Sequence, residues 1–403
     1  MKKSVDYKLF FSALALVIFG MIMISSVSVY GSARVTGLQA AKGLIAEPYN
    51  YFYVLRNIAH VVIGIITMIF ITKIHYSVFE KYAKYIFGVA IILLVLVLAI
   101  GTEYKGAKGW LSIPKLPNIQ PTEFLKISLI LFLAAFFKKY KGYLKDFKHG
   151  FLPYISIIGI VVLLVGLQPD FGTILVVVPI SAIMFFYAGA NIKHLLITFV
   201  LGLFLATSVY FSGVYDKSKP ETRKSLSYIT DRVDNFLADN KEIIKNRTIN
   251  YQTEQALIAI GSGGFTGLGF GQSIQKYGYL PEVQGDFIFS VIIEELGFMG
   301  GFTLLLIYLY IGYRGFYIAS RVKDPFGRYV AVGVASWIMM QAFINIGVNL
   351  NIVPLTGITL PFISFGGSSL LSLMISLGIL LNISREMETS QKYSRLSRKK
   401  YMF

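Results

Sequence analysis

Long apolar blocks alternate with short polar connections along nearly the whole chain. Each block is close to the ~20 residues that a helix needs to cross a bilayer. The pattern therefore predicts an all-α polytopic membrane protein with about ten transmembrane helices. The predicted spans are 8–30, 53–72, 84–101, 121–137, 151–167, 171–188, 193–212, 286–313, 329–350 and 362–383.

Composition agrees with this pattern. Of the 403 residues, 55% are hydrophobic and only 15% are charged, whereas soluble domains carry about 25% charged residues. There is no cysteine, so neither disulfides nor thiol chemistry is expected.

The net charge of +17 would suit nucleic acid, but its distribution favours a membrane orientation signal instead. Lys and Arg gather at the N-terminus and in alternate connections, and we expect these parts in the cytoplasm, with both termini inside. The basic parts are 1–8, 138–150, 313–328 and 384–403. We therefore expect one membrane domain over 1–383 and a basic cytoplasmic tail over 384–403 that meets membrane lipid rather than nucleic acid.

One predicted extracytoplasmic connection, 212–285, is much longer than the others and precedes the eighth span. Loops beyond about 15 residues are usually functional. Six polar motifs lie at predicted outward span ends, which indicates an outward-facing pocket. They are KGAKGW (105–110), QPTEFLK (120–126), QPDFGT (168–173), YQTEQALIAIGSGG (251–264), YLPEVQGDFIFSVIIEELG (279–297) and PFISFGGSS (361–369).

Asp286 is the main catalytic candidate, because it stands where the long polar loop meets an apolar span. Ionisable groups at such positions are costly to keep and are functional-site hypotheses by default. The alternative is that Asp286 only caps the helix that begins at FIFSVII.

The motifs SIQKYGYLPEVQGDFIF (273–289) and GITLPFISFGGSSLLSLMISLGILLNISRE (357–386) resemble the SEDS family of bacterial shape, elongation, division and sporulation proteins. They are most similar to its division branch, the FtsW type. The resemblance implies a ten-helix glycosyltransferase that polymerises lipid II, an undecaprenyl-pyrophosphate-linked disaccharide peptide, at the outer face of the bacterial cytoplasmic membrane, at the septum. It implies a class B penicillin-binding transpeptidase and other division proteins as partners, and it places the essential acid on Asp286.

Four positions in three motifs depart from the family pattern. Gln284 and Gly285 replace the usual His-Thr before the acid, so titration of a histidine there is lost. Gly109 precedes the loop tryptophan in place of arginine, with Lys108 next to it. Phe365 replaces a tyrosine and lacks its hydroxyl.

The implied reaction inverts an α-linked donor to a β-linked product in one displacement. It needs one general base, for which Asp286 fits, and no second protonated carboxyl, because pyrophosphate leaves without a proton. It also needs positive charge or a divalent cation, Mg²⁺ or Mn²⁺, on the phosphates. Candidates for that charge near outward span ends are Arg56, Lys108 and Lys126.

The other predicted substrate-binding residues each have a structural alternative. Glu282 could orient the acceptor sugar or share a cation with Asp286, or be a solvated loop charge. Trp110 stacks on a sugar or anchors at the interface, and Asp170 contacts substrate or caps a helix. Lys126 meets a phosphate or pairs with Glu123 three residues before it.

Two further substrate candidates are Gln284 and Ser368, the latter inside FGGSS, which also suits close helix packing. Glu294 and Glu295 lie ~12 Å below the acid, too deep for the same sugar, and are expected to be buried partners of a cation such as Arg56. His60, four residues from Arg56, is expected to be a satisfied internal histidine.

Two other functions compete with glycosyl transfer. A lipid II flippase would need a polar path through the bilayer, for which Glu294 and Glu295 are the candidates. A non-catalytic scaffold for the transpeptidase would not need the acid. An elongation or sporulation homologue would share the same activity.

Overall fold

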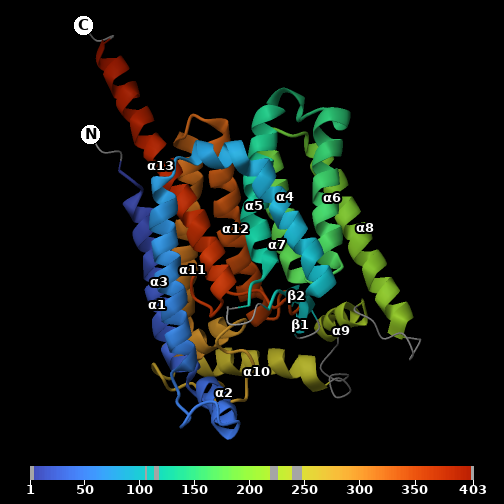
Figure 1. Ribbon diagram of the computed structural model, residues 1–403, viewed down its shortest axis with the longest axis vertical. Coiled ribbons are helices and arrows are strands. Elements are labelled where there is room, and N and C mark those ends of the chain that lie inside the picture. The colour runs from blue at the N-terminus through green and yellow to red at the C-terminus, as the bar shows by residue number, and fades with distance from the viewer. Residues whose placement is uncertain (1–3, 105–106, 113–117, 218–225, 238–246, 401–403) are drawn as a thin grey trace.

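The computed structural model describes residues 4–104, 107–112, 118–217, 226–237 and 247–400. Within these residues the structure is mostly helical (Figure 1), and its sheet is one antiparallel hairpin of β1 (Thr102–Tyr104) and β2 (Ala107–Trp110). The predicted all-α membrane class is confirmed. Each of the ten predicted spans corresponds to one described helix: α1 (Tyr7–Val27), α3 (Phe52–Lys73), α4 (Tyr76–Ile100), α5 (Pro121–Lys139), α6 (Leu152–Gly166), α7 (Phe171–Tyr187), α8 (Ile192–Lys217), α11 (Ile288–Arg321), α12 (Pro325–Asn349) and α13 (Gly367–Lys400).

Among the described residues, eight helices are long and apolar enough to cross a membrane by length and composition. The segment of α6 reaches that length together with a preceding π-helical turn, η2 (Phe147–Phe151). The exceptions are α5, which carries four charged residues, Glu123, Lys126, Lys138 and Lys139, and α7, which has 17 residues. Both pack against α12 and are covered by other helices, so they tolerate charge or shortness that a lipid-facing span would not.

Three helices outside the spans gather at one end of the bundle, opposite the two chain termini (Figure 1). They are α2 (Val29–Ala41), α9 (Leu226–Leu237) and α10 (Arg247–Gly263). We call this the α10 end. Almost all of α2 lies in the connection between the predicted spans 8–30 and 53–72, and α9 and α10 lie within the long connection 212–285.

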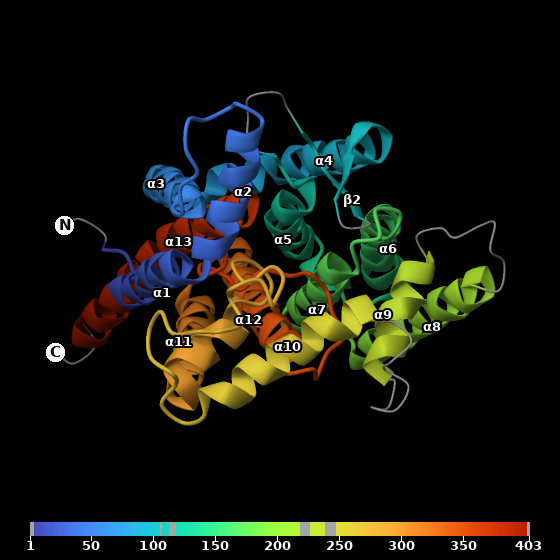
Figure 2. The same ribbon diagram turned by 90° about the horizontal axis from the view of Figure 1, so that it is seen from below.

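The middle of the bundle is formed by α12 and α13, in which 83% and 78% of the residues of the apolar stretch are buried. Around them stand α1, α3, α5, α7 and α11, while α8 lies at the periphery (Figure 2). Because α12 is enclosed, its amide side chains, Gln341, Asn345 and Asn349, bond to other protein groups. Such a helix can hold a site in place.

The predicted span 286–313 is not one straight helix. Although α11 has 34 residues, or ~50 Å against an apolar core of ~30 Å, it is broken at Gly297 (φ 68°). The 264–269 backbone fills the break, with Leu268 and Gly269 N–H groups donating to the carbonyls of Glu294 and Glu295. A Cβ on Gly297 would lie 2.4 Å from the Phe265 carbonyl oxygen, so this position requires glycine.

The segment 355–366, between α12 and α13, is not helical, although the predicted span began at 362. It enters the bundle: a Cβ on Gly20 of α1 would lie 2.7 Å from the Ile363 Cα, and Tyr308 of α11 donates a hydrogen bond to the Pro361 carbonyl. Gly20 precedes the α1 end at Val27 by about 10 Å at ~1.5 Å per residue. This segment, 355–366, therefore lies below the surface of the α10 end, and we call it the re-entrant segment.

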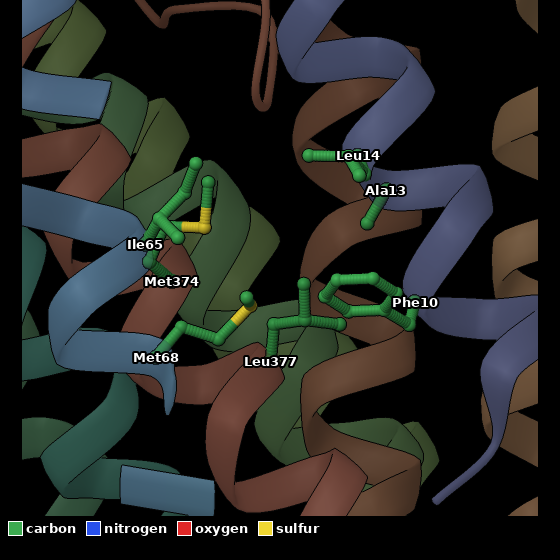
Figure 3. Close-up of a pocket in the computed structure, with 7 residues that line it drawn as sticks. All are labelled: Phe10, Ala13, Leu14, Ile65, Met68, Met374 and Leu377. Atoms are coloured by element: carbon green, nitrogen blue, oxygen red, sulfur yellow. The ribbon is translucent and has the colours of Figure 1, made fainter. Parts of the chain in front are cut away.

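A small cavity lies between α1, α3 and α13, and the side chains lining it carry only carbon and sulfur (Figure 3). Its lining residues are Phe10, Ala13, Leu14, Ile65, Met68, Met374 and Leu377. With no polar group to orient a ligand, it is not a candidate for chemistry.

Candidate functional site

The two residues before Asp286 are hydrogen-bonded to two successive residues of the 355–366 segment. The Phe365 N–H donates to the Gln284 carbonyl at 2.8 Å, and the Ser364 hydroxyl donates to the Gly285 carbonyl at 2.7 Å. These bonds join two of the six sequence motifs, 279–297 and 361–369, as the sequence predicted. They fix the backbone immediately before Asp286.

The Asp286 carbonyl is held from α12. It accepts hydrogen bonds from the side-chain amides of Asn345 and Asn349, each at 2.9 Å. Three consecutive carbonyls, at 284, 285 and 286, are therefore fixed by groups outside their own turn. Asp286 itself is half-buried, and its Oδ2 atom would lie 3.6 Å from a Cβ on Gly357, so the carboxylate borders the re-entrant segment.

Asp286 is not the N-cap of α11, which corrects the alternative weighed from the sequence. The cap position is Phe287, whose side chain makes no capping bond. The N–H of Ser290, in the first turn, donates instead to Asn349 Oδ1 at 3.1 Å. The Ser290 N–H is thus satisfied from α12, and the cap position of α11 is Phe287 rather than the acid.

Glu282 stands in the turn before Asp286 and is half-buried, with φ 57°. Its carbonyl accepts from the Gly285 N–H at 2.9 Å, which closes the turn. The described residues hold no group of three or more His, Cys, Asp or Glu side chains arranged for a metal ion.

Lys126 is not placed to meet a substrate phosphate. Its ammonium is 2.8 Å from Glu123 Oε1 and 2.9 Å from Gln341 Oε1, and it lies over the Trp337 ring. The residue is 3% exposed, so no face of the amine opens to a ligand. The ion pair predicted by the three-residue spacing is confirmed, and it compensates both charges inside the bundle.

Two other substrate candidates have structural roles. The Asp170 carboxylate caps α7, accepting from the Thr173 N–H at 3.0 Å and its hydroxyl at 2.7 Å. Ser368 accepts from the Gln120 N–H at 3.1 Å, which joins the starts of α13 and α5. A Cβ on Gly172 would lie 2.9 Å from the Thr356 carbonyl, so QPDFGT also borders the re-entrant segment.

Arg56 is exposed on α3, and its guanidinium stacks on the Phe52 ring at 4.4 Å. One turn further, His60 packs beside the Phe365 ring at 5.6 Å. Its Nδ1 atom is buried and has no hydrogen-bond partner among the residues that the structure describes, which differs from the expectation of a satisfied histidine. Arg56 and His60 thus lie on the face of α3 that borders the 361–369 motif.

Glu294 and Glu295 are both buried, as expected, but only Glu295 pairs with a cation, and that cation is Lys276 rather than Arg56. Lys276 Nζ lies 2.9 Å from Glu295 Oε1, and Glu294 accepts from the Ser273 hydroxyl and from two backbone N–H groups. Both carboxylates are at most 1% exposed. They bind the 273–276 loop to α11 close to the break.

Trp110 is half-buried in the hairpin, and its carbonyl accepts from the Thr102 hydroxyl at 3.2 Å. The bridge between Leu111 and Ile119 continues the hairpin towards α5. Lys108 lies in β2, opposite Glu103, but its side chain falls outside the described part of the structure. These two candidates stay predictions.

Comparison with known proteins places these features in one family. The family model for cell cycle proteins of the FtsW, RodA and SpoVE type matches residues 7–389. The chain belongs to this family. The resemblance drawn from the motifs around Asp286 and Gly366 is therefore confirmed.

Individual members of the family match over nearly their whole length. The stage V sporulation protein E of Bacillus subtilis is 38% identical over 338 residues, or 83% of this chain and 88% of that protein. A protein of the same organism named "Probable peptidoglycan glycosyltransferase FtsW" is 36% identical, covering 99% of this chain and 94% of its own.

Solved structures share the fold. The rod shape determining protein RodA of Thermus thermophilus is 26% identical with a TM-score of 0.66, covering 94% of this chain and 97% of its own. A chain from a peptidoglycan synthase complex, described as coordinating polymerization and crosslinking, is 25% identical with a TM-score of 0.71, covering 95% and 98%.

Two of the departures from the family motifs, Gln284 and Phe365, lie on the same side of the site, near Gly31 and Tyr53. The Gln284 side-chain oxygen would lie 4.0 Å from a Cβ on Gly31, so it points towards α2. The Phe365 ring packs edge-on against Tyr53 at 5.1 Å. Position 365 thus contacts α3 through its ring and lacks the hydroxyl of the family's tyrosine.

Sequence reasoning missed Asn345, Asn349, Ser364 and Lys276. A signal for the first two was present, because they stand four residues apart near the end of an apolar span and so share one helical face. Ser364 and Lys276 gave none, since their partners are 79 and 19 residues away.

Proposed function

We propose that this protein is a peptidoglycan glycosyltransferase that polymerises lipid II at the outer face of the cytoplasmic membrane, with Asp286 as its general base. The observation that carries the proposal is the Asp286 peptide, held by three consecutive carbonyl bonds inside the α10 end. A base is effective only when it is held within hydrogen-bond reach of the proton that it takes.

The basic connections support this orientation. Residues 138–150 and 313–328 lie at the end of the bundle that carries the termini, opposite α10 (Figure 1). By the positive-inside rule that end faces the cytoplasm and the Asp286 end faces outward. Lipid II at the outer leaflet would then present its sugar to the carboxylate.

In the proposed step, the 4-hydroxyl of the acceptor sugar attacks the anomeric carbon of the donor. Asp286 takes the hydroxyl proton as the new glycosidic bond forms, and the donor's bond to the lipid diphosphate breaks with its electron pair. The anomeric centre inverts once, so no covalent enzyme intermediate is needed. The second carboxyl of a glycosidase is unnecessary because diphosphate leaves unprotonated.

Positive charge near the leaving group lowers the barrier. The exposed Arg56 guanidinium, one turn of α3 from His60, which packs beside Phe365, suits this role. Glu282 would orient the acceptor sugar. A divalent cation bound by Glu282, Asp286 and substrate oxygens would supply further charge to the diphosphate.

The transport alternative is not favoured by the contacts. The two deep carboxylates that it would use, Glu294 and Glu295, are buried and bonded to the 273–276 loop. They therefore do not line a polar path.

The proposal includes a class B penicillin-binding transpeptidase as partner and a place at the division septum. It is supported by the structural neighbour from a synthase complex that couples polymerization with crosslinking and by the FtsW relatives of several species. The sporulation relative makes spore formation the alternative setting for the same activity.

The test is strand synthesis by the purified full-length chain given lipid II, with and without a class B transpeptidase and with and without EDTA. Glycan strands are separated on a gel. Wild-type protein should make strands and Asp286→Ala should not, while Asp170→Ala, which removes only a helix cap, should still make them. Strands of normal length and amount from Asp286→Ala would refute the proposal.

A further inference from the structure

The last turns of α12 carry two buried asparagines on one face. Asn345 is 1% exposed and Asn349 is not exposed at all. Both lie in the middle of the bundle, where an unbonded amide would cost about 1–3 kcal/mol. Their bonds are therefore a strong constraint on whatever they contact.

Asn349 joins two functional pieces of backbone. Its Nδ2 donates to the Asp286 carbonyl at 2.9 Å. Its Oδ1 accepts from the N–H and the hydroxyl of Ser290 at 3.1 and 2.6 Å. One amide thus caps the start of α11 from a neighbouring helix and holds the peptide of Asp286.

Asn345 joins Asp286 to the re-entrant segment. Its Nδ2 donates to the Asp286 carbonyl at 2.9 Å and to the Ile358 carbonyl at 2.7 Å. Ile358 follows Gly357, the residue that borders the Asp286 carboxylate. The Asn345 amide therefore holds both the backbone of Asp286 and the backbone that its carboxylate faces.

We propose that Asn345 and Asn349 are positioning residues that hold the Asp286 carboxylate at the depth and angle required for proton transfer. This inference rests on the proposed role of Asp286 as the base. Without the two donors, the Asp286 peptide would lose the bonds that fix its carbonyl and could rotate. A misplacement of 1 Å can cost about 10²-fold in rate.

The experiment compares asparagine-to-aspartate variants of the full-length chain in lipid II polymerisation. Asn349→Asp keeps the oxygen that caps Ser290 but loses the donor to Asp286. The matched control is Asn382→Asp at the opposite end of the bundle, because Asn382 also accepts from a backbone N–H (Tyr76) and donates to a backbone carbonyl (Thr72). Each variant is measured for kcat, for KM and for thermal stability in detergent.

We expect Asn349→Asp to lower kcat by about 10²-fold with KM within about twofold, while Asn382→Asp loses stability but keeps a kcat near wild type. Asn345→Ala, which retains the Asn349 donor and adds no charge, should lower kcat by about tenfold. It provides the test if Asn349→Asp does not fold.

Equal kcat values for Asn349→Asp and Asn382→Asp, or a wild-type kcat for a folded Asn345→Ala, would overturn the positioning role. Asp286→Asn is assayed in parallel. If it polymerises lipid II normally, the proposed base is wrong; if it is inactive while the asparagine variants are fully active, only the positioning proposal fails.

Discussion

Replacing Lys276 by methionine should destabilise the loop that leads to Asp286. Lys276 is 4% exposed, and its ammonium donates to Glu295, to the Gly271 carbonyl and to Ser26. Glu295 is fully buried. In Lys276→Met the Glu295 carboxylate would remain buried without its counter-charge.

Removing one partner of a buried pair costs about 3–5 kcal/mol. The matched control is Lys138→Met, because Lys138 pairs with Glu80 and Asp324 but its side chain is 32% exposed. Pairs that reach solvent contribute about 0–1 kcal/mol each. The double variant Lys276→Met/Glu295→Leu removes both buried charges and should recover most of the loss.

The assay is the midpoint of thermal unfolding of the purified protein in detergent. Lys276→Met should lower the midpoint by on the order of 10 °C, Lys138→Met by a small part of that, and the double variant should lie close to wild type. The reasoning is refuted if Lys276→Met and Lys138→Met are equally stable, or if the double variant is less stable than Lys276→Met.

Two further outcomes are expected. Gly297→Ala should lower both stability and polymerisation, because its φ is 68° and its Cβ would meet the Phe265 carbonyl at 2.4 Å. The control is Gly88→Ala, in an open stretch of α4, which should raise stability by about 0.5–1 kcal/mol. A Gly297→Ala variant with wild-type thermal unfolding and strand synthesis would contradict the break in α11. Asp170→Ala should lower the free energy of unfolding by about 1 kcal/mol through the lost cap of α7 and leave kcat unchanged. A large fall in kcat for the folded variant would instead indicate that Asp170 contacts the substrate.

The number and order of the spans could be predicted from the sequence because each one is a long apolar run, and a run of that length has one stable form in lipid. The break at Gly297 could not, since it depends on the 264–269 backbone replacing helix bonds. Nor could the non-helical segment 355–366, where the last span was predicted to begin at 362. In both places a remote segment, rather than local propensity, decides the conformation.

The position of Asp286 in the site followed from its place between polar loop and apolar span. The roles of Lys126, Asp170 and Ser368 did not, because a charged or hydroxyl residue near a span end can equally cap, pair or bind. Only the contacts with Glu123, Thr173 and Gln120 separate these uses. Glu295 was correctly expected to be paired, yet its partner came from a loop whose fold the sequence pattern does not specify.

The most direct measurement is the single-turnover rate of glycosidic bond formation from lipid II by Asp286→Asn and Asp286→Glu beside wild type. Asparagine keeps the size of the side chain and removes the base, so the rate should fall by about 10²–10⁴-fold. Glutamate keeps the base but displaces it, and should retain part of the rate. A wild-type rate from Asp286→Asn would contradict the account.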